Sequence, residues 1–454
     1  MDTFLETMED KLDYLERYIM TDSYDSTTKN SVLPSPQLLE TWTAIRNSMA
    51  KNHEKGLHPL SQLVEGAEDQ SKDTTTAAVI PSFNPPISPH YSRILDRLQQ
   101  LDAKLDAFEE SYSIMPKNPQ ETLKDLRSLL YNYEKAMVAG SHRLLHFYEL
   151  PFQWRENKFI VFGYRFSKSH TAAFKSIVEV HNETANIWSH LLGAVLMIYL
   201  ALFHYPSTQV YALTSTADHF VTFIFFAAAT KCLLFSVIWH TYANISTLHL
   251  RQKFACFDYT GITVLIIASI ITTEHIALRD FPVLRWGYVI FSFLTGVAGV
   301  AFSWSPQFDK PGFRPVRILF FISLAALGAT AFITSCFKKG LFYSFDLYSP
   351  LLASFVWYLT GVVFYGSLIP ERWRSDVVID ELKICDETIL ELDRSGKLEE
   401  YLDKEPEKTK HYGKFLSLWW VDYIFSSHNI WHMFVVMGIL GHYYATLRMF
   451  KTIL

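Results

Sequence analysis

Seven apolar stretches follow one another from residue 186 onward, and they limit the fold of this chain more than any other feature. Each is about twenty residues long, the length that a helix needs to cross the hydrocarbon core of a bilayer. The stretches cover residues 186–206, 219–242, 257–277, 284–304, 316–336, 347–369 and 420–446. We therefore predict an all-α fold, a seven-transmembrane helical bundle with a cytosolic N-terminal helical region.

Charged residues are unevenly distributed along the 454 residues. Only 19% of the residues are charged, and most of these lie before residue 180 or between residues 370 and 414. This pattern predicts a soluble helical region at residues 1–145, with a linker at about 66–90. A transmembrane domain at residues 146–454 follows, with an acidic helical insert at about 371–414. The net charge of −5 gives no reason to expect a nucleic-acid partner, and the four cysteines lack the CxxC spacing of a cysteine zinc site.

Apolar residues recur at steps of three and four in the N-terminal region. One stripe contains Leu12, Leu15 and Ile19, and others lie near Leu98 and Leu126. Such stripes on charged segments indicate amphipathic helices. They predict a small cytosolic helical bundle. A coiled coil that binds a cytosolic protein partner is the alternative.

The basic residues of the short connections predict the orientation in the membrane. Lys and Arg lie before the first apolar stretch and after the second and fourth, whereas residues 207–217 have none. The positive-inside rule then places the N-terminus in the cytosol and the C-terminus outside or in a lumen. The glycosylation sequons at Asn182 and Asn244 would face the cytosol, so we predict that both stay unmodified. No cleavable signal peptide is visible, so the first span is expected to direct insertion.

Histidines occupy the ends of two predicted helices. His428 and His432 are four residues apart at the start of the seventh stretch, so they share one helical face. His240 ends the second stretch and Asp258 opens the third. An even number of spans separates the end of the second stretch from the starts of the third and the seventh, so these two residues and the histidine pair lie at one membrane face. Three imidazoles with one open position are the ligand set of a catalytic zinc. Ser236, one turn before His240, is expected to point into the same space.

These residues suggest a division of roles. The open position would hold a water molecule whose pKa falls to about 7. Asp258 would orient this water or accept its proton, and Ser236 would donate a hydrogen bond to the water or to a developing oxyanion. Structural alternatives stay open at this point: His240 could cap a helix at the interface, and Asp258 could be an N-cap.

Several motifs in this order resemble the progestin and adipoQ receptor family, which includes haemolysin III and the fungal Izh-type zinc-homeostasis proteins. The similarity is closest to the fungal branch with a long N-terminal extension. It implies a zinc ion held on the cytosolic side by His240, His428 and His432, with Ser236 and Asp258 as further polar members of the site. The matching stretches are Leu150-Pro151, Trp154 to Asn157, Gly163-Tyr164-Arg165, His181 to His190, Ser236 to Thr241, Asp258 to Gly261, Pro370-Glu371-Arg372 and Ser427 to His432.

The resemblance implies receptor signalling with hydrolysis of ceramide to sphingosine and fatty acid, as proposed for the adiponectin receptors. We therefore expect a zinc-dependent hydrolase of a lipid amide, with a sphingolipid or fatty acid as its membrane-lipid partner. The alternative is a receptor or homeostatic regulator in which the zinc is structural or sensed. A zinc transporter is disfavoured, because no chain of acidic or histidine residues leads through the spans. The fungal likeness and the absence of a signal peptide favour an endomembrane, the endoplasmic reticulum, over the plasma membrane.

Polar residues at the start of the first stretch form a further pattern. Glu183, Asn186 and His190 are three and four residues apart, so they line one helical face. We expect them to hydrogen-bond neighbouring helix ends, with binding of a lipid headgroup as the alternative. His190 is not expected to be a metal ligand, since three histidines suffice.

Two features depart from the family pattern. About fifty residues separate Glu371 from the seventh stretch, where the family has a short loop, and we expect an acidic helix there that docks on the N-terminal stripes. Its apolar positions are Val378, Leu382, Cys385, Ile389 and Leu392. The second departure is Lys231, in the middle of the second stretch, where a charged side chain has a high free-energy cost. It lies nine residues from His240, so it should face away from the metal, and the sequence suggests no partner for it.

Overall fold

The structure is a computed structural model that describes residues 132–454 apart from 306–307, 309–310, 382–387, 389–390 and 393–394. The part of the predicted N-terminal helical region before residue 132, with the linker at about 66–90, lies outside these residues. The described part is all-helical and contains only isolated β-bridges, so the predicted fold class is confirmed.

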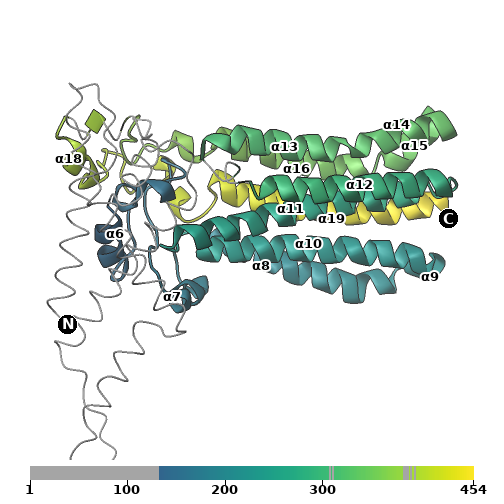
Figure 1. Ribbon diagram of the computed structural model, residues 1–454, viewed down its shortest axis with the longest axis horizontal. Coiled ribbons are helices and arrows are strands. Elements are labelled where there is room, and N and C mark those ends of the chain that lie inside the picture. Colours follow the sequence, from purple (N-terminus) through teal and green to yellow (C-terminus); the bar gives the residue numbers. More distant parts are fainter. Residues whose placement is uncertain (1–131, 306–307, 309–310, 382–387, 389–390, 393–394) are drawn as a thin grey trace, which may run out of the picture. The chain divides into compact units, whose positions relative to one another are not determined.

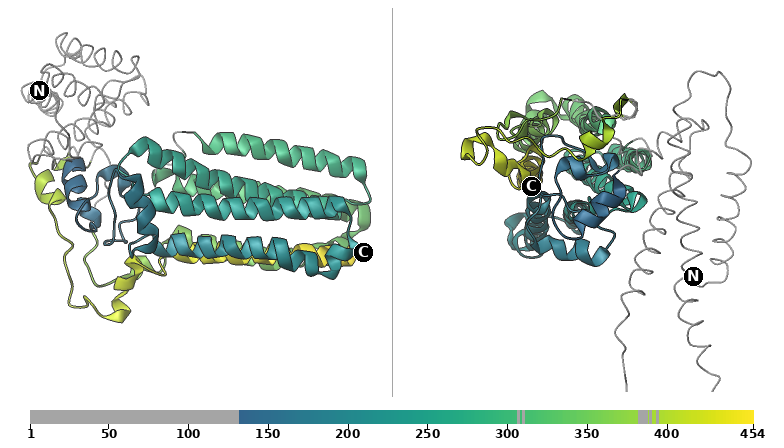
Figure 2. Two further views of the ribbon diagram at one scale, coloured as in Figure 1. Left: turned by 90° about the horizontal axis from the view of Figure 1, so that it is seen from below. Right: turned by 90° about the vertical axis from the view of Figure 1, so that its left-hand side faces the viewer.

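Seven of the described helical segments are long and apolar enough to cross a membrane. They run side by side, with the short elements α6, α7 and α18 gathered at one end of the bundle (Figures 1 and 2). The seven are α8 (Thr184–Tyr199) with the turns η4 (Leu200–His204) and η5 (Tyr205–Ser207), α10 (Thr216–Tyr242), α11 (Leu248–Ala277), α12 (Pro282–Ser303), α13 (Arg314–Ala326) with α14 (Gly328–Lys339), α16 (Leu351–Ser367) and α19 (Ser427–Ile453).

Short helices connect these spans. The α-helices are α6 (Tyr133–Gly140), α7 (His170–Lys175), α9 (Gln209–Leu213), α15 (Leu341–Tyr348) and α18 (Leu398–Leu402). The 3₁₀ turns are η1 (Phe147–Glu149), η2 (Phe152–Trp154), η3 (Ser176–Val178), η6 (Pro311–Phe313), η7 (Glu371–Trp373), η8 (Phe415–Ser417) and η9 (Trp419–Asp422).

Helix α19 lies at the centre of the bundle, where it packs against α8, α11 and α16. Its contact with α16 is close because Gly438 lies against the ring of Tyr358. A Cβ atom at Gly438 would come within 2.6 Å of that ring. Small residues allow membrane helices to approach in this way, and van der Waals packing then holds them together.

The predicted spans agree with the structure to within a few residues, with two exceptions. The third helix begins at Leu248 instead of residue 257, because a helical turn that buries Arg251 and Ala255 precedes the apolar stretch. The seventh begins at Ser427 instead of residue 420. Leu418 has a positive φ of 66°, a 3₁₀ turn follows it, and the Ser426 side chain then caps the helix by accepting a hydrogen bond from the Asn429 N–H.

The insert between the sixth and seventh spans differs from the prediction at its start. Val378 lies in extended chain, and its N–H donates to the carbonyl of Glu407, next to an isolated antiparallel bridge between Val377 and Lys408. Val378 is therefore not part of a helix, contrary to the prediction. Most apolar positions of the predicted acidic helix, and the N-terminal stripes on which it was predicted to dock, lie outside the described residues.

Candidate metal centre

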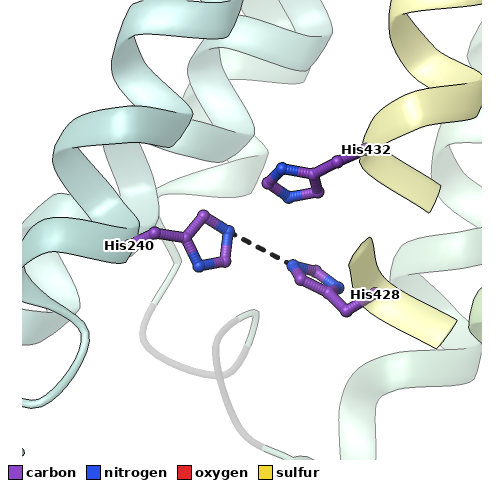
Figure 3. A group of neighbouring side chains, drawn as sticks. All are labelled: His240, His428 and His432. Carbon is purple, nitrogen blue, oxygen red and sulfur yellow. Dashed lines mark hydrogen bonds between the residues drawn. The ribbon is translucent and has the colours of Figure 1, made fainter. Parts of the chain in front are cut away.

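Three histidines from two helices meet at the end of the bundle where α10 ends and α19 begins (Figure 3). One possible ligand atom from each of His240, His428 and His432 lies within 4.8 Å of the others. The Nε2 atoms of His240 and His428 are 3.2 Å apart. Two nitrogens bound tetrahedrally to one zinc ion at about 2.0–2.1 Å lie at a similar spacing. The predicted set of histidines is thus together, in a geometry that fits a single metal ion.

The Nδ1 atoms of two of these rings are occupied by acceptors. His240 Nδ1 lies 2.7 Å from the Glu183 carboxylate, and His432 Nδ1 lies 3.1 Å from the backbone carbonyl of Asn186. An imidazole that donates through Nδ1 keeps a lone pair on Nε2. Metal-binding histidines are usually oriented in this manner by a carboxylate or a carbonyl. The donor set therefore has the chemistry of a ligand set as well as its spacing.

Glu183 is itself held in place from the start of α8. Asn186 Nδ2 donates to it at 2.7 Å, and Asn186 in turn accepts a 2.6 Å hydrogen bond from Asn429 on α19. Burial opposes ionisation of Glu183, but the contacts with His240 and Asn186 outweigh this and hold the pKa of the carboxyl well below its usual range. The expectation that this face bonds neighbouring helix ends is confirmed for Glu183 and Asn186, whereas His190 forms no side-chain hydrogen bond with the described residues. The specific role of Glu183 in orienting His240 was not predicted.

The end of α10 that carries His240 is capped by Arg165. Its guanidinium donates to the carbonyl of His240 at 2.8 Å and to the carbonyl of Thr241 at 3.1 Å. The last carbonyls of a helix lack partners within the helix, so a basic side chain stabilises them. Burial lowers the pKa of Arg165 to about 10, so it is still a cation at neutral pH. This contact gives a structural reason for the Gly163-Tyr164-Arg165 motif.

The start of α19, which carries the other two histidines, is capped by Glu371. This buried carboxylate accepts hydrogen bonds from the backbone N–H of Ser427, at 2.7 Å, and from its hydroxyl. Asn157 donates to the same carboxylate at 3.1 Å. A negative charge is favourable at a helix N-terminus. The sequence contained Glu371 only as part of a family motif, and nothing in its local pattern pointed to a cap fifty-six residues away.

The other two predicted site residues, Ser236 and Asp258, are not part of the histidine group. Ser236 is buried one turn before His240, and its hydroxyl has no hydrogen-bond partner among the described residues. Asp258 lies within α11, ten residues after its first residue, so the N-cap alternative is wrong. It is outside the group of three close ligand atoms.

His190 lies beside the site. Its ring stacks on that of His432 with centroids 3.7 Å apart, and neither of its nitrogens has a partner in the part of the chain that the structure describes. Like Asp258, it is outside the group of three close ligand atoms.

Comparison with known proteins identifies the family. Residues 178–443 match the family described as haemolysin-III related. The chain is 45% identical to the ADIPOR-like receptor IZH3 of Saccharomyces cerevisiae over 74% of its own length and 65% of that protein. It is 40% identical to the ADIPOR-like receptor IZH3 of Eremothecium gossypii, over 71% of this chain and 76% of the relative. An adiponectin receptor protein of Drosophila melanogaster is 29% identical over 55% of this chain and 58% of its own length.

The matched residues make up more than half of the chain and include the helices that carry the three histidines. Arg165 and Asn157, which contact these helix ends or their caps, lie before the matched region. Together with the seven apolar helices, the match establishes a multi-pass integral membrane protein. The chain belongs to the haemolysin-III-related family, in its fungal branch of adiponectin-receptor-like Izh proteins.

Proposed function

We propose that His240, His428 and His432 hold a zinc ion and that this membrane protein regulates lipid and zinc homeostasis by hydrolysing a lipid amide such as ceramide. The observation that carries the proposal is the convergence of three imidazoles, two of them oriented through Nδ1. Three histidine ligands leave one position open, as in catalytic zinc sites. When bound, zinc would polarise the amide carbonyl and lower the pKa of a water molecule to about 7.

The protein's own groups supply the remaining requirements of the reaction. Hydrolysis adds water across the amide C–N bond, which gives a carboxylic acid and an amine. Ser236 has a buried hydroxyl that no described residue engages, and in this proposal it would donate a hydrogen bond to the carbonyl oxygen as negative charge develops there. Asp258, on the helix packed against α10, would accept the proton of the attacking water and pass it to the amine nitrogen.

A regulator with a structural or sensed zinc ion is the second candidate. The observation that favours it is the link from Asn157, in the segment before α8, through Glu371 to the N-terminus of α19. Occupation of the histidines could thus alter the position of segments outside the membrane. In this candidate, a cytosolic protein would bind through the N-terminal helices at residues 1–145.

We also propose that the histidine end faces the cytosol in an endomembrane, the endoplasmic reticulum. Asn182 and Asn244 both lie at this end, immediately before α8 and just after α10. Treatment of the protein from its native membrane with a glycosidase should leave its mobility unchanged. A glycan on either asparagine would reverse the proposed orientation.

Fatty-acid release from ceramide by the purified full chain separates the two candidate functions. We expect His432→Ala and Asp258→Asn to abolish release, while His142→Ala, which changes an exposed histidine away from the site, leaves it at the wild-type rate. Equal behaviour of the wild type and both site variants would exclude the hydrolase. If signalling still depended on the histidines, the second candidate function, a regulator with a structural or sensed zinc ion, would be supported.

A further inference from the structure

Lys231 lies far from the histidine site, on the outer face of the bundle. It is fifteen residues after the start of α10 and eleven before its end. At 1.5 Å per residue, this puts it roughly 22 Å and 16 Å from the two helix ends, near the middle of the span. The side chain is exposed whereas that of His240 is buried, which confirms that the two face in different directions.

No described residue forms an ion pair with Lys231. Its nearest interaction is with Phe235, whose ring centroid is 5.1 Å from the ammonium nitrogen. A lysine side chain can extend towards the interface, but it covers only part of the distance from the middle of the span. A charge at this depth is costly, and such charges in membrane proteins usually have a partner and a function. The cation–π contact is a weak compensation, so the ammonium still needs an anion.

Lys231 is one of the residues that line a groove between α8 and α10, two helices that lie side by side (Figure 1). The groove has a volume of about 540 Å³, within the range of small-ligand sites. Lys231 is its only charged lining residue, and nearly all the others are apolar. On α10 the lining runs from Phe223 to Ile238, a length of roughly 22 Å at 1.5 Å per residue. Lys231 lies near the middle of this stretch, so an anion on it leaves roughly 12 Å of groove along α10 for the first part of an apolar chain.

A break in the regular geometry of the first span occurs beside this groove. Residues Leu200–His204 form a π-helical turn, η4, and both Ala201 and Leu202 from this turn line the groove. Turns of this kind are rare and frequently lie at functional sites. The π turn is an observation independent of the charge, and it points to the same place.

We propose that this groove binds a long-chain fatty acid, with its carboxylate on the Lys231 ammonium and its chain along α8 and α10. A phospholipid is a poorer fit, because its phosphodiester keeps its charge in the apolar region, whereas a carboxylic acid can enter in its neutral form before it pairs with Lys231. A partner helix with an acidic residue is also a poorer fit. Close helix association favours small residues; the groove has Ala201, Ala227 and Thr230, but large side chains such as Phe223, Phe235 and Leu202 lie among them.

The site can be tested with a photoreactive palmitate and the purified full chain in phosphatidylcholine nanodiscs. We expect labelling at groove residues such as Leu234, and competition by palmitate but not by hexadecanol, which has no carboxylate. Lys231→Met should weaken binding at least about tenfold, since a hydrogen bond to a charged group contributes that much or more. Lys231→Arg should retain most of it, and Ala227→Trp, which fills the groove, should abolish labelling.

Two controls separate this site from the rest of the protein. Lys338→Met changes an exposed lysine at the end of α14 and should leave binding unchanged. Removal of metal with a chelator should also leave it unchanged, which makes the result independent of the histidine site. Equal labelling of the wild type and Lys231→Met, or equal competition by hexadecanol, would overturn the proposal. A membrane protein that co-purifies with the wild type, blocks labelling by the photoreactive acid and is absent from preparations of Lys231→Met would also overturn the proposal. The occupant of the groove would then be a partner helix.

Discussion

The Glu183→Gln substitution tests whether the network around the histidines exists to bind metal. One oxygen of Glu183 accepts hydrogen bonds from both His240 and Asn186 at 2.7 Å, and the other accepts one from Asn182 at 3.2 Å. Glutamine has the same shape but one acceptor oxygen and no charge. If that oxygen keeps the bond to His240, its amide NH₂ faces the NH₂ of Asn182.

The size of the effect follows from these contacts. The variant replaces a charge-assisted hydrogen bond on His240 with a neutral one, and hydrogen bonds to charged groups are roughly twice as strong. Loss of about 1.4 kcal/mol corresponds to a tenfold weaker equilibrium. Carboxylates behind metal-bound histidines commonly account for about ten- to hundredfold in metal affinity. We therefore expect zinc binding to weaken by about tenfold or more.

The assay is competition for zinc between the purified protein and a chromogenic chelator. Glu179→Gln is the matched control, because it removes an exposed glutamate four residues away without touching the histidines. The control should bind zinc like the wild type. An unchanged affinity in Glu183→Gln would mean that the carboxylate does not orient a metal ligand, and the interpretation of the network would be wrong.

Three further predictions concern the scaffold around the site. Glu371→Gln weakens the cap on Ser427, so it should lower the apparent melting temperature and the zinc affinity together, as read from thermal unfolding and chelator competition. Arg374→Met leaves the carboxylates that Arg374 pairs with, including Asp422, buried without a cation, and should destabilise the fold by about 3–5 kcal/mol; wild-type thermal stability would contradict this. Burial lowers the pKa of His181 from 6.5 to about 4, so the unfolded chain binds more protons below pH 6.5 and the folded state loses stability as the pH falls towards 4. Between pH 7 and pH 5 this group lowers the free energy of unfolding by about 2 kcal/mol. The His181→Gln variant should lack this loss, so its free energy of unfolding should differ less between the two pH values than that of the wild type.

Much of the metal centre could be predicted because it depends on helix ends. The apolar stretches determine where a helix enters and leaves the membrane, so His240, His428 and His432 had to lie at one face of the bundle. The direction of Lys231 could be predicted for a similar reason, since the angle between two positions of a straight helix follows from their separation. Asp258 was placed at a helix start because hydropathy does not register the polar turns that begin α11 at Leu248.

The parts that were missed depend on contacts between distant segments. Glu371 caps α19 across fifty-six residues, and Glu183 meets His240 across fifty-seven. No periodicity in the sequence encodes these pairings. An acidic residue in an apolar context beside a predicted helix start is the one sequence signal that could have indicated them. The groove beside Lys231 likewise depends on how α8 and α10 pack, and on a π turn that the sequence of residues 200–204 did not reveal.

In the proposed metal centre, three imidazoles from α10 and α19 hold one divalent ion. Elemental analysis of the purified full chain, with His142→Ala as the folded control and His428→Ala as the site variant, tests it most directly. We expect about one zinc ion per chain in the wild type and the control, and loss of zinc from His428→Ala without loss of the folded bundle. A well-folded wild-type protein that contains no zinc, or a site variant that retains it, would contradict the account.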